Sequence, residues 1–213
     1  MSSSVKPSSV PGPVTARTLR TPDDLIGAGL VPPSARADLL AVAGQYATAI
    51  PPAFAALIEQ PDDPIGLQVI PTPDELFVAP AERSDPIGDD ALSPVPGIVH
   101  RYADRALLKP LLVCPLYCRF CFRREHVGPD GGVLDEAALA GALDWLRTHP
   151  QIREVILTGG DPLMLSARRL GEIVRGRSAM EHGTTIRGHT RVPVAAPERV
   201  TDAMLDALGT DEA

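Results

Sequence analysis

IREVILTGGDPLMLSARRLGEIV, residues 152–174, is the stretch of sequence that decides the fold. Its apolar run at 155–158 predicts a buried strand that ends at Gly159 and Gly160. Ser166 then predicts the N-cap of a helix whose apolar residues recur at helical spacing. A strand followed at once by a helix of this length is one βα unit of a parallel sheet.

Further βα units are expected on both sides of this stretch. Before it, the apolar run 111–113 predicts a strand and Asp135 predicts the N-cap of a helix. After it, 184–189 predicts a weaker strand and Thr201 the start of a last helix. About three units fit into residues 99–213, which is too few to close a barrel. We therefore predict an α/β fold, a partial (β/α) barrel of parallel strands.

The residues before this partial barrel have a different character. Residues 1–20 predict a flexible lead-in. Residues 21–98 predict a helical and wrapping segment, with one helix capped by Ser34 and a shorter helix at 53–58. Residues 60–98 are rich in proline and acids, but their interspersed apolar residues predict an ordered, irregular path. A disordered linker is the alternative for that part.

The composition of the 213 residues excludes several classes of protein. A net charge of -7 argues against non-specific nucleic-acid binding, which needs a basic surface. No apolar run approaches the roughly 20 residues that span a membrane. The start of the chain lacks the apolar core of a signal peptide. We therefore expect a cytoplasmic protein with no membrane or nucleic-acid partner.

All three cysteines lie in one short stretch, Cys114-Pro-Leu-Tyr-Cys118-Arg-Phe-Cys121. An odd, clustered set predicts metal or redox chemistry rather than a disulfide framework. Three thiolates would hold a four-iron cluster and leave one iron open for another molecule. A Cys3His zinc site completed by His126 is one alternative, and three buried thiols acting as small apolar side chains are another. The lack of a fourth cysteine disfavours a ferredoxin-like electron carrier.

The cysteine motif, with Phe120 directly before its last cysteine, resembles the CxxxCxΦC signature of the radical S-adenosylmethionine (radical-SAM) superfamily. The flanking sequences HRYADR at 100–105 and FRREH at 122–126 resemble the lysine 2,3-aminomutase family within it. The likeness extends over residues 22–208 and implies the N-terminal portion of such an enzyme. The [4Fe–4S] ligands that it implies are Cys114, Cys118 and Cys121.

The resemblance also implies residues that bind S-adenosylmethionine (SAM). Phe120 would lie against the adenine, while Gly159, Gly160 and Asp161 would contact the amino group. Glycines at the end of a strand let the backbone approach a ligand closely, although Gly-Gly-Asp-Pro is also an ordinary turn sequence. Reductive cleavage of SAM would then give a 5′-deoxyadenosyl radical.

Four further residues are implied to bind pyridoxal 5′-phosphate (PLP) and the substrate. Arg101, Tyr102 and Arg105 would hold the PLP phosphate, because guanidinium groups and a phenol are good donors for a dianion. Arg123 would pair with the substrate carboxylate. An exposed charged face is the alternative for the first three residues. We expect all the implied site residues to lie at the carboxyl ends of the strands, as in other barrel enzymes.

The activity implied by the resemblance is that of an isomerase, a PLP-dependent aminomutase that moves the amino group of lysine from carbon 2 to carbon 3. Relatives that act on glutamate or arginine, or that β-lysylate a translation factor, are the alternatives. The implied partners are a small amino-acid substrate and an external electron donor such as flavodoxin or ferredoxin. A homo-oligomer is a further option.

Two features depart from the family pattern. PLP needs a lysine amine for its Schiff base, but the chain has only Lys6 and Lys109, and we expect Lys109 at the start of the first barrel strand. We therefore assign no catalytic residue. Gly176 is expected to interrupt a helix and Gly188 to weaken a strand. Together these features predict a truncated, poorly stable and inactive chain, so the alternative function is a remnant that serves as an iron–sulfur or zinc-binding module.

Overall fold

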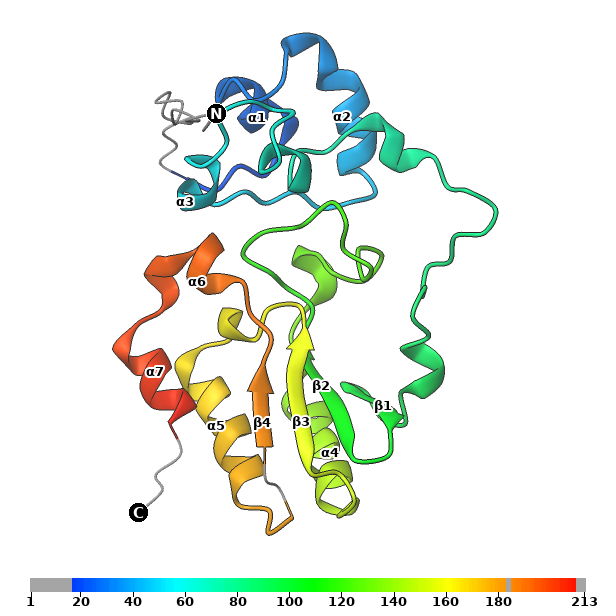
Figure 1. The fold of residues 1–213 in the computed structure, drawn as a ribbon, viewed down its shortest axis with the longest axis vertical. Coiled ribbons are helices and arrows are strands. Elements are labelled where there is room, and N and C mark those ends of the chain that lie inside the picture. Colours follow the sequence, from blue (N-terminus) through cyan, green and yellow to red (C-terminus); the bar gives the residue numbers. More distant parts are fainter. Residues whose placement is uncertain (1–16, 183–184, 210–213) are drawn as a thin grey trace, which may run out of the picture.

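Four strands form one sheet in the computed structural model, which describes residues 17–182 and 185–209 (Figure 1). In sheet order they are β1 (Ile98–Tyr102), β2 (Arg105–Leu111), β3 (Glu154–Gly159) and β4 (Thr185–Gly188). β1 pairs antiparallel with β2, and the other pairings are parallel. These strands form an open sheet, which confirms the predicted α/β partial barrel. Residues 1–16 of the predicted lead-in, and Thr184 of the predicted last strand, lie outside the described residues.

The strand predicted at 111–113 is wrong, because the structure places it at Arg105–Leu111. The charges at Arg105 and Lys109 conceal this strand in the sequence. Ala106 and Leu108 are buried against the helices, so the charged side chains alternate with them and lie on the opposite face of the sheet. One face of a strand tolerates charge when only the other face is packed in the core.

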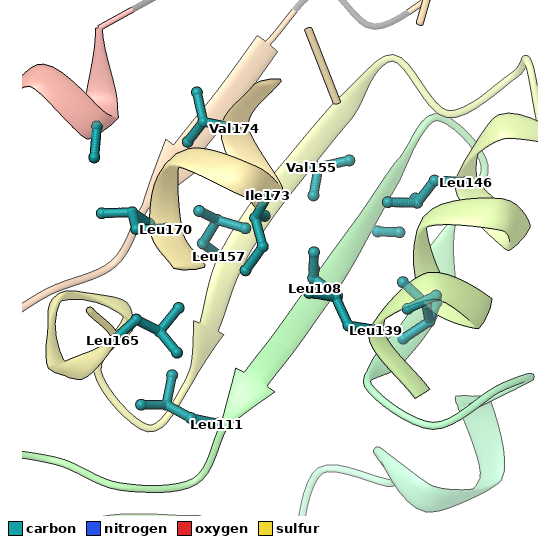
Figure 2. Close-up of a cluster of buried hydrophobic side chains, with 14 of the residues drawn as sticks. Leu108, Leu111, Leu139, Leu146, Val155, Leu157, Leu165, Leu170, Ile173 and Val174 are labelled. Carbon is teal, nitrogen blue, oxygen red and sulfur yellow. The ribbon is translucent and has the colours of Figure 1, made fainter. Parts of the chain in front are cut away.

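Helices cover one face of the sheet. They are α4 (Glu136–Arg147), α5 (Ala167–Ser178) and α7 (Asp202–Leu208), the last of which packs on α5. Leucine, isoleucine and valine side chains from the strands and from α4 and α5 interlock between these layers (Figure 2). This core holds β2 and β3 in register, so that their carboxyl ends lie together.

The predicted N-caps of these three helices are confirmed. Asp135 accepts a hydrogen bond from the backbone N–H of Ala138 at 2.7 Å. Ser166 and Thr201 accept equivalent bonds at the starts of α5 and α7. Each cap satisfies a backbone donor that the first helical turn leaves free.

The expectation that Gly176 interrupts its helix is wrong, because α5 continues to Ser178. A Cβ at Gly176 would lie 3.3 Å from Cδ1 of Leu143 on α4, so the glycine allows the two helices to pack closely. The next residue, Arg177, is fully buried and donates to the carbonyl of Ile152 at 2.6 Å. This part of the chain is therefore a tightly packed helix.

Most of the residues before the sheet form a separate layer above it, and the last of them run down beside the sheet to β1 (Figure 1). This layer contains the short helices α1 (Pro22–Gly27), α2 (Arg36–Ala43) and α3 (Pro52–Ala55). α2 is shorter than predicted and has no side-chain cap from Ser34, because a 3-10 turn at Pro33–Ala35 leads into it and Gly44 ends it. α3 also ends earlier than predicted.

The irregular segment after α3 is ordered, as predicted, and not a disordered linker. Short 3-10 turns punctuate it at Gly66–Gln68, Pro73–Leu76 and Asp90–Leu92. Val69 and Ile70 are buried in a second apolar core, which also takes in Leu116 from the cysteine loop and Ala195 from α6 (Val192–Ala195). The N-terminal layer therefore packs directly against the segment that carries the cysteines. Among the described helices, none is both long enough and apolar enough to cross a membrane.

Candidate functional site

The three cysteines lie in the loop 112–128, which leaves the carboxyl end of β2 and passes between the sheet and the N-terminal layer (Figure 1). All three are free thiols that are neither buried nor fully exposed. Together they line one small cavity of about 50 Å³. Cys121 and Phe120 also border a wider hollow of about 780 Å³ beside the loop. The structure thus brings the three predicted ligands to one place.

The thiols influence one another electrostatically. Burial raises the pKa of Cys114 to about 12, and negative charge on Asp161 and on the other two cysteines adds to this effect. Burial also raises the pKa of Cys118, while the nearby Arg191 guanidinium opposes the shift. Cys114 and Cys118 are therefore neutral thiols at pH 7 unless a metal displaces their protons.

The donor set fits a cluster better than a single metal ion. Within 17–182 and 185–209, no three His, Cys, Asp or Glu side chains converge closely enough to hold one ion. A [4Fe–4S] cube binds each cysteine through a different iron, so its ligands need not meet at one point. His126, the fourth ligand of the zinc alternative, lines other cavities and not the one that the cysteines share. The geometry therefore disfavours the zinc site.

An ion pair that the sequence analysis missed fixes the cysteine loop to the N-terminal layer. Arg119 donates from Nε to both carboxylate oxygens of Glu75, at 3.0 and 3.1 Å, and from Nη1 to the carbonyl of Ala47 at 2.8 Å. Its backbone N–H donates to the carbonyl of Gln68 at 2.8 Å. Arg119 stands inside the cysteine motif, but its partners lie 44 and 72 residues away, so no sequence pattern identifies them.

Gly159 and Gly160 bring the end of β3 against the strand beside it. Gly159 has φ +102, and a Cβ there would lie 2.6 Å from the carbonyl oxygen of Leu111. A Cβ on Gly160 would lie 2.4 Å from the carbonyl oxygen of Val113. The close approach that requires glycine is therefore to the backbone that leads into Cys114.

The carboxylate of Asp161 joins three segments of the site. It accepts hydrogen bonds from the backbone N–H of Leu163 at 3.0 Å, from Oγ1 of Thr190 at 2.7 Å and from the backbone N–H of Arg191 at 2.7 Å. Its own N–H donates to Val113 at 2.9 Å. Asp161 is only 4% exposed, so these bonds are shielded from water. The predicted SAM-binding acid thus also holds the start of α6 beside the cysteine loop.

Phe120 lies beside Arg191. The Phe120 ring is 62% exposed, and Cζ of Arg191 is 5.5 Å from the ring centre. Nη1 of the same arginine lies 2.8 Å from Sγ of Cys118. An exposed aromatic face next to the cysteines is suited to stacking on a flat ring such as adenine.

The residues implied for PLP phosphate lie elsewhere. Tyr102 and Arg105 are register partners at the hairpin between β1 and β2, with Cζ of Arg105 5.7 Å from the Tyr102 ring centre. Arg101, next to them, donates to the carbonyl of Ile87. Arg105 begins β2, so it lies about 20 Å along the strand from the cysteine loop, at about 3.3 Å per residue. Because β1 runs antiparallel to β2, all three residues lie at the amino ends of the parallel strands, and the expectation that they lie at the carboxyl ends of the barrel strands is wrong.

Arg123 and Lys109 share a buried partner. Asp89 accepts from Nε of Arg123 at 3.0 Å and from Nζ of Lys109 at 3.4 Å. All three side chains are largely shielded from solvent. Lys109 is near the carboxyl end of β2, not at its start as expected, because the strand begins earlier than predicted. Asp89 is a second site residue that the sequence analysis missed.

Comparison with known proteins agrees with this geometry. Residues 108–209 match the family model described as the Radical SAM superfamily. This matched segment belongs to the radical-SAM superfamily. Curated proteins named L-lysine 2,3-aminomutase are 38% identical in Acetoanaerobium sticklandii and 39% identical in Clostridium subterminale, each over 75% of this chain. The one from Escherichia coli is 34% identical over 76% of the chain.

The chain spans 39% of the length of the first two relatives and 48% of the third. The coverage agrees with the expectation that it corresponds to a portion of such an enzyme. Membership of the superfamily implies a [4Fe–4S] cluster and SAM. The cysteine loop, with its three thiols, is the place in the described structure that suits the cluster.

Proposed function

We propose that this chain is the radical-generating part of a PLP-dependent aminomutase that moves an amino group from carbon 2 to carbon 3 of lysine or a related amino acid. The observation that carries the proposal is the convergence of Cys114, Cys118 and Cys121 on one cavity beside Gly159–Asp161. A cluster and SAM bound there would supply the organic radical. The protein would supply placement, charge and exclusion of water.

The chain's own residues would position SAM and the substrate. Phe120 would stack on the adenine, and Asp161, with the backbone of Gly159 and Gly160, would face the amino group of SAM. Arg123 uses only Nε for Asp89, so its two terminal nitrogens can bind a substrate carboxylate in the bidentate manner that arginine favours.

The PLP part of the proposal concerns the other end of the sheet. Tyr102 and Arg105 form a donor pair there, and Arg101 lies beside them. Arg101, Tyr102 and Arg105 would hold the PLP phosphate at the start of β2 through charged and phenolic donors. An external electron donor such as flavodoxin or ferredoxin would reduce the cluster.

Anaerobic reconstitution tests the proposal. The full chain is treated with iron and sulfide, analysed for both, reduced with dithionite and given SAM. We expect a [4Fe–4S] stoichiometry and the release of methionine and 5′-deoxyadenosine. A chain that binds zinc and no cluster, or a cluster that leaves SAM intact, would contradict the radical function.

Two variants make the test specific. Cys118→Ser should remove most of the iron, because a cube cannot be held firmly by two thiolates. His126→Gln should leave iron binding and SAM cleavage unchanged, since His126 does not line the cysteine cavity. Loss of the bound metal in His126→Gln would instead indicate the Cys3His site.

A further inference from the structure

We propose that Arg191 is a positioning residue for electron transfer, because its guanidinium donates a hydrogen bond to Sγ of Cys118 and so makes the bound cluster easier to reduce. This inference rests on the proposed cluster at the cysteine loop. It adds a redox role to a residue that lies 73 positions from its sulfur partner.

The contact is direct. Nη1 of Arg191 lies 2.8 Å from Sγ of Cys118, and the same guanidinium lies over the Phe120 ring. Arg191 therefore touches both a proposed iron ligand and the aromatic side chain beside it. A guanidinium stays protonated at any working pH, so it presents this donor permanently.

The backbone of Arg191 is fixed independently of its side chain. Its N–H donates to the buried carboxylate of Asp161 at 2.7 Å, and the preceding Thr190 donates to the same carboxylate. α6 follows directly, and Ala195 at its end is buried in the core of the N-terminal layer. The guanidinium is thus presented from a backbone that is held on both sides.

Arg191 also differs from the other arginines around the loop in its lack of a described acidic partner. Arg119 is paired with Glu75, Arg123 with Asp89, and Arg124 with Glu82 and Glu125. Among the described residues Arg191 has no carboxylate within ion-pair distance of its guanidinium. Its positive charge is therefore not compensated and acts on the sulfur that it contacts.

Reduction adds one electron from a low-potential donor to the cluster and breaks no bond. The added negative charge is shared with the thiolate sulfurs, so a cation bonded to Cys118 stabilises the reduced form more than the oxidised form. Hydrogen bonds to the sulfurs are among the features that set the potential of such clusters. Bonds to charged groups are also stronger than neutral ones.

The test is an EPR-monitored redox titration of the reconstituted full chain without SAM. In Arg191→Gln we expect the ratio of reduced to oxidised cluster at a fixed potential to fall about tenfold, which is ~59 mV for one electron. The substitution leaves the backbone bond to Asp161 in place. The matched control is Arg168→Gln on α5, which removes an exposed arginine paired with Glu172 and should leave the midpoint unchanged.

A second measurement covers the case in which Arg191→Gln loses iron. Wild-type protein labelled with ¹⁵N at arginine should show a weak ¹⁵N coupling in the pulsed EPR spectrum of the reduced cluster, and Arg191→Lys should lose it.

An unchanged midpoint in iron-replete Arg191→Gln would overturn the proposal, as would the lack of ¹⁵N coupling in wild type. Weaker SAM binding with an unchanged midpoint would show that Arg191 contacts SAM instead of sulfur. Failure of the wild type to assemble a cluster would contradict the proposed function itself.

Discussion

The two ends of the sheet are built in different ways, although both carry residues that the sequence marks as functional. At the carboxyl end, Asp161 is buried and its carboxylate accepts three short hydrogen bonds. At the amino end, Glu154 lies between Arg105, at 3.5 Å, and Arg187, and both arginines are largely exposed. The first arrangement fixes three chain segments around the cysteines. The second leaves exposed arginine side chains that an anion could reach.

The proposed cluster and SAM site lies at the carboxyl end of the sheet, and the proposed PLP phosphate site lies at the amino end. The two ends differ in how firmly their residues are held. The cysteine loop is fixed by backbone hydrogen bonds and a shielded ion pair, as expected for a site that must keep its geometry. At the hairpin end, the ion pairs of Glu154 are made with arginines that are largely exposed, and such pairs contribute little to stability. Perturbing each end in turn therefore tests the comparison.

The largest expected effect is that of Asp161→Ala. It leaves three donors without their acceptor in a buried place, so we expect the free energy of unfolding to fall by roughly 3 kcal/mol and iron binding to be impaired. Denaturant titration of the metal-free chain measures the first effect. Asp135→Ala, the same change at an exposed N-cap, should cost only about 1 kcal/mol. Equal losses in the two variants would show that the carboxyl end is not specially fixed.

A smaller effect is expected of Gly160→Ala. The added Cβ would clash with the carbonyl of Val113, so β2 and β3 must separate at their ends, at about 1–3 kcal/mol. Gly188→Ala is the control, because no atom lies within 4 Å of the position of its Cβ. We expect that change to be neutral within about 0.5 kcal/mol. Thermal unfolding of the two variants, measured side by side, gives the difference between their losses of stability.

The smallest effect is expected at the amino end. Glu154→Gln removes the partner of two exposed arginines and should change stability by less than about 1 kcal/mol, and less at high salt. Denaturant titrations at low and high ionic strength measure the difference. A loss as large as that of Asp161→Ala would mean that this end is as rigid as the other.

Local features of this protein follow from the sequence alone. The strand–turn–helix at 152–174 and the caps Asp135, Ser166 and Thr201 depend on residues a few positions apart, so their pattern is visible in the chain. The cysteine motif is local for the same reason, and its spacing is enough to predict a shared site. β2 is the exception, because charges on its unpacked face conceal the alternation of buried residues.

Only the tertiary structure decides what surrounds the cysteines. Glu75 pairs with Arg119, which lies 44 residues away in the sequence. Arg191 contacts Cys118, which lies 73 residues away. Such long-range contacts depend on how the layers pack, and no spacing of residues in the sequence predicts them. Packing also separates Arg105 from the cysteines, although the two are close in sequence, because an extended strand carries the chain away by about 3.3 Å per residue. The sequence determines which local elements form, and the packing of those elements determines which side chains meet.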